Sequence, residues 1–168
     1  DFDTLKTSLK LSEKQIRAIL SLKLKTDELH EEYLSLSERK IRFILPFEDD
    51  YPQKLLNIRD YPFGIFVKGD VPQNKKSVAI VGSRSASEYG LGMAKFIARE
   101  LAQSGVDIIS GMALGVDTRA HEGAVDGAGK TYAVLGTGVN VCYPESNCNL
   151  YNNLCEKDFG GVISEFPL

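Results

Sequence analysis

The sequence offers its clearest chemistry at three glycine-containing turns, each of which follows an apolar run. The first, Gly82-Ser83-Arg84, combines a residue that lets the backbone turn sharply with a hydroxyl group and a guanidinium fork suited to phosphate oxygens. The second, Ser110-Gly111-Met112-Ala113-Leu114-Gly115, can form a nest of backbone N–H groups. The third, Gly136-Thr137-Gly138, can form a similar nest. One such turn is a weak indication, because glycine after a strand often serves only the turn. Three of them together predict an anion site, and phosphate is the natural ligand.

The helix that is expected to begin near Gly90 strengthens this prediction. Its free N–H groups would point at the same space, and helix N-termini attract anions. The residues expected to contact phosphate are Gly82, Ser83, Arg84, Ser87, Gly90, Ser110, Gly111, Gly115, Gly136 and Gly138.

Familiar cofactor and metal patterns are missing from the sequence. The first turn has neither the G-x-G-x-x-G spacing of dinucleotide sites nor the G-x4-G-K-[ST] of a Walker loop, which disfavours NAD, FAD and ATP hydrolysis. Cys142, Cys148 and Cys155 follow a C-x5-C-x6-C spacing without the paired C-x2-C knuckles of structural zinc sites. We therefore expect no cofactor, no metal and three reduced cysteines without a functional role.

Asp117 and His121 could form a catalytic pair, because four residues separate them on an expected helix and an acid can orient an imidazole base. The simpler interpretation is that Asp117 caps the helix while His121 hydrogen-bonds a neighbouring loop. No Ser or Cys lies in a recognisable activating motif. Glu165, after the last expected strand, is better explained as a residue that fixes a loop. We therefore expect a binding protein rather than an enzyme.

The three turns need a scaffold that brings them to one edge, and the pattern after residue 76 provides it. Apolar runs at 78–81, 106–109, 132–135 and 162–163 are typical of buried parallel strands. Between the first two runs, an apolar stripe at helical spacing is formed by Ala94, Ile97, Ala98, Leu101 and Ala102. The alternation predicts an α/β fold, an extended Rossmann-like parallel sheet that is covered on both faces. Ligands bind such sheets beyond the carboxyl ends of the strands, where the strand order reverses.

The residues before this sheet are expected to form a small helical domain. Ser12 begins a capping box with Gln15, a second helix is expected from Thr26, and a third over Ser37 to Leu45. From Pro46 onward, prolines and glycines surround the short run 65–67, a plausible edge strand. The predicted domains are a helical domain over residues 1–45 and a Rossmann-like domain over residues 46–168.

The composition of the 168 residues, 43% hydrophobic and 26% charged, is ordinary for a globular protein. A net charge of −3 argues against nucleic-acid binding by bulk electrostatics, so any such site must be local. The sequence has no apolar run of membrane length and no leader pattern, which indicates a cytoplasmic protein without a membrane partner. The chain begins with Asp1 instead of Met and ends at Leu168 without a recognisable closing element. We therefore expect a fragment of a longer protein.

The blocks around the turns resemble the DprA/Smf family of bacterial DNA-processing proteins. The matching blocks are Ala79–Arg84 with Tyr89-Gly90, Ser110–Asp117 with Ala120-His121, Ala133–Gly138 with Tyr143-Pro144, and Ile163-Ser164-Glu165. The resemblance extends from about Tyr51 to Pro167, and the helices before residue 46 are similar to the family's sterile-alpha-motif-like domain in position and helicity.

The resemblance implies an extended Rossmann fold that binds single-stranded DNA, protects incoming DNA and loads the RecA recombinase in natural transformation, beside single-strand-binding protein and without enzymatic activity. It assigns Gly82, Ser83, Arg84 and Ser87 to the DNA-contacting loop, and Ser110, Gly111 and Gly115 to the same pocket. The full-length protein is expected to be a homodimer, with dimerisation and RecA contacts supplied by a stretch after the Ser-Glu block.

Two alternatives remain open at this point. The first is a nucleotide-processing enzyme related to the phosphoribohydrolases that share this Rossmann variant, although their P-G-G-x-G-T loop with its following Glu is replaced here by Gly136-Thr137-Gly138-Val139. The second is a nucleotide-sensing regulatory module. Binding of a thymidine oligomer compared with free mononucleotides separates the three functions.

Overall fold

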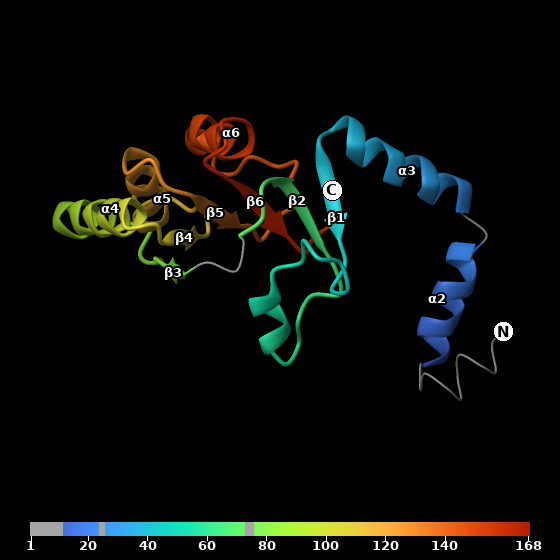
Figure 1. Ribbon diagram of the computed structural model, residues 1–168. Helices are drawn as coiled ribbons and strands as arrows, with labels where there is room; N and C mark the ends of the chain where they lie inside the picture. Colours follow the sequence, from blue (N-terminus) through green and yellow to red (C-terminus); the bar gives the residue numbers. More distant parts are fainter. Residues whose placement is uncertain (1–11, 24–25, 73–75) are drawn as a thin grey trace. The chain divides into compact units, whose positions relative to one another are not determined.

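The computed structural model describes residues 12–23, 26–72 and 76–168 (Figure 1). The chain divides into two compact units, residues 1–39 and 40–168, and each is described by itself. In the described ranges, no helix has both the length and the apolar character that a membrane crossing requires.

The first unit consists of helices α2 (Glu13–Lys23) and α3 (Thr26–Glu38) in its described part. The predicted capping box before α2 is confirmed. The backbone N–H of Ser12 donates to Gln15 Oε1 at 2.9 Å, and Gln15 N–H donates back to Ser12 Oγ at 3.4 Å. These bonds satisfy backbone donors that a helix start leaves free, so they fix where α2 begins.

The second unit contains one six-stranded sheet with the order β1-β2-β6-β5-β4-β3. Strands β3 to β6 are parallel to one another, whereas β2 is antiparallel to both β1 and β6. The strands are β1 (Ile41–Ile44), β2 (Ile65–Gly69), β3 (Ser77–Ala79), β4 (Asp107–Ser110), β5 (Thr131–Val134) and β6 (Gly160–Ser164). The predicted α/β, Rossmann-like character is confirmed, with an antiparallel pair added to the parallel core.

Two predictions about the antiparallel part are wrong. The helix expected over Ser37 to Leu45 is instead strand β1, in which Ile41 pairs with Lys68 of β2. The run 65–67 is not an edge strand either, because β2 lies between β1 and β6. A long-range contact explains the first error. The rings of Phe43 and Phe66 pack in a tilted arrangement with centroids 4.6 Å apart, and cross-strand pairing of this kind overrides local helix propensity.

The α-helices of the second unit lie on one face of the sheet, while the expected cover of the other face comes from residues 46–64. Helix α4 (Glu88–Gln103) follows β3, α5 (Val116–Asp126) follows β4, and α6 (Cys148–Glu156) follows β5. Across the sheet, the neighbouring strands β3, β4, β5 and β6 follow one another in chain order. Right-handed crossovers therefore place every connecting helix on the same side (Figure 1). The strand order, which single-sequence patterns do not reveal, decides this.

A core of small side chains lies between the sheet and its helices. Ile108 of β4 packs with Ala98 and Ala102 of α4 and with Ala120 and Ala124 of α5. Helices α4 and α5 approach so closely that a Cβ at Gly123 would collide with the carbonyl oxygen of Lys95. The predicted apolar stripe of α4 is only partly buried. The alanines of the stripe are covered, whereas Ile97 remains 43% exposed.

The other face of the sheet packs against residues 46–64, which include the short 3-10 helix η1 (Gln53–Asn57). Tyr51 is fully buried there beside Ile65, Tyr132 and Ile163, and its hydroxyl donates to the carbonyl of Pro62 at 2.9 Å. This cover does not reach across the whole face. Val134 of β5 is 52% exposed and lines an apolar groove of about 390 Å³.

Candidate functional site

The turns after β3, β4 and β5 meet in a crevice of about 270 Å³ at the carboxyl edge of the parallel strands. The strand order does not reverse beside it, so the crevice differs from the switch point that the sequence led us to expect. It is lined by Arg84, Gly111, Ala113, Leu114, Leu135, Gly136, Thr137, Tyr143 and Pro144.

One buried carboxylate joins the first two turns. Asp117, in the first turn of α5, is 6% exposed and accepts hydrogen bonds from the backbone N–H of Gly82 at 3.3 Å and of Gly111 at 3.1 Å. The N-cap of α5 is Gly115, so Asp117 is not the cap that we expected. These two N–H groups are occupied within the protein and therefore cannot be the donors to a ligand that the glycine pattern predicted.

Several other predicted residues support the crevice rather than line it. Ser110 is buried and donates its hydroxyl proton to the carbonyl of Ile80 at 2.7 Å, which ties β4 to the end of β3. Gly115 adopts φ +82°, and a Cβ there would collide with the carbonyl oxygen of Ser83. Because Ser83 also accepts the N–H of Val116 at 3.2 Å, the first turn rests directly on the start of α5.

The remaining predicted residues have partners of their own. Ser87 is the N-cap of α4, and its Oγ accepts the N–H of Gly90 at 3.3 Å, so that helix donor is already satisfied. Gly138 is buried, and a Cβ on it would meet the backbone of Pro167 and Leu168. Of the ten predicted residues, Arg84, Gly111 and Gly136 are those that line the crevice.

The groups left for a ligand are backbone N–H groups and one cation. In the part of the chain that the structure describes, the N–H groups of Ala113, Leu114, Gly136 and Thr137 make no hydrogen bond within the protein. Arg84 is exposed and forms no ion pair with any described residue. A guanidinium beside several free N–H groups is suited to the oxygens of a phosphate.

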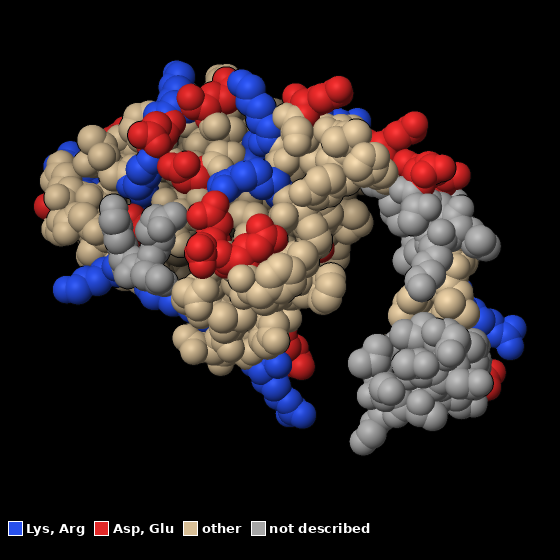
Figure 2. Space-filling view, turned by 45° about the vertical axis from the view of Figure 1, so that its right-hand side comes forward, with Lys and Arg blue, Asp and Glu red and all other residues tan. Residues whose placement is uncertain are grey.

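The other basic side chains of residues 77–168 are mostly engaged in ion pairs. Lys95 contacts Asp126 at 2.9 Å, Arg119 contacts Glu122 at 2.7 Å, and Lys130 lies between Asp70 and Asp158. On the face that Figure 2 displays, Lys and Arg alternate with Asp and Glu instead of forming a basic surface. Arg84 is therefore the basic side chain of residues 77–168 that the described structure leaves available beside the crevice.

The sequence reasoning did not include Tyr143 and Pro144 among the site residues, although both line the crevice. The ring of Tyr143 is 65% exposed, so it is accessible to a ligand in the crevice. The only signal in the sequence is the Tyr-Pro pair five residues after the third turn, and residue type alone does not distinguish an exposed tyrosine from a buried one.

His121 is a structural residue. It is fully buried, and its Nδ1 lies 2.7 Å from Thr131 Oγ1, which itself donates to the carbonyl of Ile108 at 2.9 Å. The single hydroxyl proton of Thr131 is thus used, so His121 donates from Nδ1. Burial lowers the pKa of His121 to about 3, which keeps the ring neutral. The predicted hydrogen bond exists, but its partner belongs to strand β5 and not to a loop.

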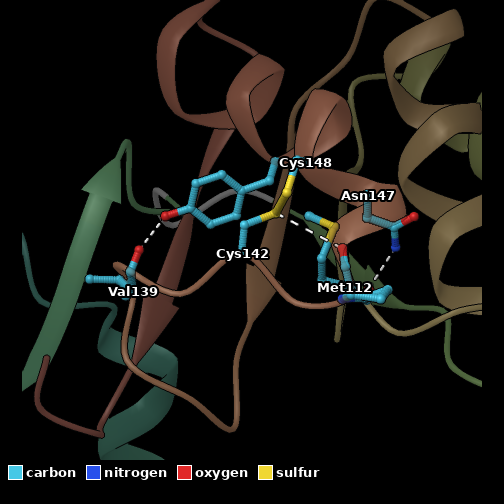
Figure 3. The surroundings of a disulfide bond; sticks show 7 residues. Met112, Val139, Cys142, Asn147 and Cys148 are labelled. Atoms are coloured by element: carbon cyan, nitrogen blue, oxygen red, sulfur yellow. Dashed lines mark hydrogen bonds between the residues drawn. A yellow bond between two sulfur atoms is a disulfide. The ribbon is translucent and has the colours of Figure 1, made fainter.

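The prediction of three reduced cysteines is wrong for two of them. Cys142 and Cys148 form a disulfide with their Cα atoms 5.7 Å apart (Figure 3), whereas Cys155 is a free thiol whose pKa is raised by burial to about 11. The chain folds back between Cys142 and Cys148, which their sequence spacing does not show. Among the residues described, no cluster of His, Cys, Asp or Glu has the arrangement of a metal site.

The profile of the DNA recombination-mediator protein A family matches residues 42–168. The chain belongs to this family. Its relatives include protein Smf of Escherichia coli strain K12, 38% identical over 133 residues, and DNA processing protein DprA of Streptococcus pneumoniae, 38% identical over 140 residues. These matches cover 78% and 83% of this chain but 35% and 49% of the relatives, so the chain spans less than half the length of either protein.

Solved structures of the DNA recombination-mediator protein A family agree with the fold. The X-ray structure of DprA from S. pneumoniae gives a TM-score of 0.75 at 31% identity, over 92% of this chain and 52% of that one. DNA processing protein A from Helicobacter pylori, whose structure concerns its single-stranded DNA binding mode, gives a TM-score of 0.64 at 26% identity, over 77% of this chain and 57% of that one.

Proposed function

We propose that the crevice binds the sugar–phosphate backbone of single-stranded DNA. The observation that carries this proposal is the exposed guanidinium of Arg84, which forms no ion pair with the described residues and shares the crevice with the unbonded N–H groups of Leu114, Gly136 and Thr137. Such groups contact phosphate oxygens without regard to base identity. The single-stranded DNA binding mode of the H. pylori relative supports the same assignment.

We further propose that the full-length protein protects incoming single strands, loads RecA beside single-strand-binding protein, and acts as a homodimer without catalysing a reaction. Membership of the family supports this role. The lack of catalysis is supported by the two residues best suited to acid–base chemistry, since Asp117 and His121 both serve internal hydrogen bonds. We also propose that the helices before Lys40 correspond to the family's sterile-alpha-motif-like domain.

The test is fluorescence anisotropy of labelled thymidine oligomers over a chloride series. Arg84→Ala is expected to weaken binding to every sequence about equally and to flatten the slope of log K against log salt by roughly 0.7 for each phosphate that the variant no longer neutralises. Arg84→Lys should restore only part of the affinity, because a point charge does not replace a bidentate fork.

Lys157→Ala is the matched control, since Lys157 is exposed, forms no ion pair among the described residues and lies outside the crevice lining. If folded Arg84→Ala binds DNA as tightly as the parent protein, the crevice is not the DNA site. Mononucleotides that compete as well as an oligomer of equal phosphate content would instead favour a nucleotide-processing or nucleotide-sensing function.

A further inference from the structure

The disulfide between Cys142 and Cys148 brackets two residues that line the crevice. It closes a small loop that contains Tyr143 and Pro144, the two wall residues that follow the third turn. The Sγ of Cys142 also lies 4.0 Å from the carbonyl oxygen of Pro144 (Figure 3). The covalent bond and the ligand-facing residues thus belong to the same short stretch of backbone.

Both ends of this stretch are held by hydrogen bonds that do not involve the sulfur atoms. Before it, the carbonyl of Val139 accepts the hydroxyl of buried Tyr151, which belongs to α6. After it, the side-chain amide of Asn147 donates to the carbonyl of Met112 (Figure 3) and to Thr118 Oγ1, each at 2.8 Å. These hydrogen bonds are therefore expected to hold the two ends in place when the disulfide is reduced.

Between these anchors the disulfide is the main constraint. The hydrogen bonds of the intervening described backbone are local, from Val141 N–H to Gly138 and from Asn147 N–H to Pro144, at 3.0 and 2.9 Å. The Tyr143 ring is largely exposed, so packing of this side chain adds little restraint. Removal of the disulfide would thus enlarge the conformational freedom of the wall without unfolding what flanks it.

The two bonded cysteines are suited to thiol exchange, and the third cysteine is not. Cys142 and Cys148 are both half-buried, so neither residue is sealed in the core. Cys155, which also lies on α6, has its pKa raised to about 11 by burial, so at neutral pH it is a thiol and a poor nucleophile. Thiol–disulfide exchange is therefore expected at Cys142 and Cys148 and not at Cys155.

We propose that Cys142 and Cys148 form a reversible thiol–disulfide exchange site that sets the position of the Tyr143-Pro144 wall. On oxidation, the two thiols lose two protons and two electrons and form one S–S bond, while a disulfide of the glutathione class accepts both and leaves as two thiols. Reduction by a thiol reverses this through a mixed disulfide. In the oxidised protein the wall is fixed beside Arg84, and in the dithiol form it is released.

The exchange site is tested without any ligand. After equilibration with glutathione disulfide, thiol counting should find one free thiol in the parent chain and three after reduction. Hydrogen exchange of the backbone over residues 140–146 should be slower in the oxidised form. Cys142→Ser should abolish the difference, whereas Cys155→Ser, the matched control, should retain it. Three free thiols under oxidising conditions, or equal exchange in the two forms, would overturn the inference.

The consequence for DNA rests on the proposed function and is measured separately. The oxidised form should bind a thymidine oligomer about threefold to tenfold more tightly than the reduced form, because the wall is already ordered. Equal affinities of the two forms would refute this coupling. If neither form binds DNA, the proposed function fails, and the hydrogen-exchange result still decides the exchange site.

Discussion

Asp117 uses each of its carboxylate oxygens for a different turn, so a single side chain sets the distance between the loops after β3 and β4. An amide in its place presents one acceptor oxygen and one donor, so one of the two backbone N–H groups would face an N–H₂ group. We therefore expect Asp117→Asn to lower the free energy of unfolding by about 1–3 kcal/mol, the usual cost of an unsatisfied buried group.

Urea denaturation measures this decrease, and Asp126→Asn serves as its control. Asp126 pairs with Lys95 on the surface, where an ion pair contributes at most about 1 kcal/mol. Equal stabilities of Asp117→Asn and the parent protein would show that the turns are held together by something other than this carboxylate.

His121 makes stability depend on pH in a direction that follows from its burial. Its pKa is about 3 in the folded protein, against about 6.5 when unfolded, so the unfolded chain binds the extra proton as pH falls. The free energy of unfolding should therefore be highest above pH 7 and decrease by about 2 kcal/mol between pH 7 and pH 5. Denaturation curves across that range should show this slope in the parent protein, and a parallel slope in His121→Leu would contradict the assignment.

Tyr143 is the side chain of the crevice best suited to a nucleobase, because its ring is exposed beside the groups expected to contact phosphate. Stacking of a base on an aromatic ring contributes about 1–3 kcal/mol, so Tyr143→Ala should weaken oligomer binding by roughly tenfold or more. Tyr143→Phe should bind like the parent protein, since it keeps the ring. Phe96→Ala, which removes an exposed ring outside the crevice lining, is the control for the anisotropy titration.

At the scale of elements, the contact between the first turn and the start of α5 depends on Gly115. Alanine there is strained by φ +82° and also collides with the carbonyl oxygen of Ser83. Gly105 provides a matched comparison, since its φ is +75° but a Cβ would meet nothing within 4 Å. Gly105→Ala should cost about 1 kcal/mol of stability and Gly115→Ala at least twice as much. Thermal unfolding of both variants gives the comparison, and equal decreases would mean that a small backbone shift relieves the collision.

The elements that sequence patterns predicted well are those with local signals. The parallel strands stand within a residue or two of the apolar runs, and Ser12 with Gln15 marks the start of α2. Strand β1 was missed because its four residues have no pattern of their own, and only pairing with β2 makes them a strand. The single-sided arrangement of the helices depends on strand order, which no local window contains.

The candidate site was predictable as a location and much less so as a set of side chains. Glycine and serine after a strand indicate a tight turn at the carboxyl edge, which is where the crevice lies. Whether Ser110 or Gly111 faces a ligand depends on hydrogen-bond partners that the residues of the turn do not reveal, here Ile80 and Asp117. The disulfide escaped prediction for a similar reason, because it depends on how the loop folds back.

For the whole molecule, the division between Arg39 and Lys40 predicts an independent second unit. The crevice, both apolar cores and the complete sheet are formed by residues after 39. A chain of residues 40–168 should therefore unfold cooperatively within a few degrees of the 168-residue protein and bind oligomers with the same affinity. A large decrease in either property would show that the helices before Lys40 support the sheet or contribute to the site.

The groove beside Val134 will affect how this protein behaves at high salt. Apolar side chains such as Ile109 and Pro72 line it, and Val134 is half exposed there. Sulfate and other salting-out ions strengthen apolar association, while any salt weakens contacts with phosphate. In ammonium sulfate the protein should bind to itself and to phenyl resins under the conditions in which the proposed DNA binding is weakest. The resulting aggregates would mimic a steeper salt dependence. Chloride titrations monitored by light scattering keep the two effects apart.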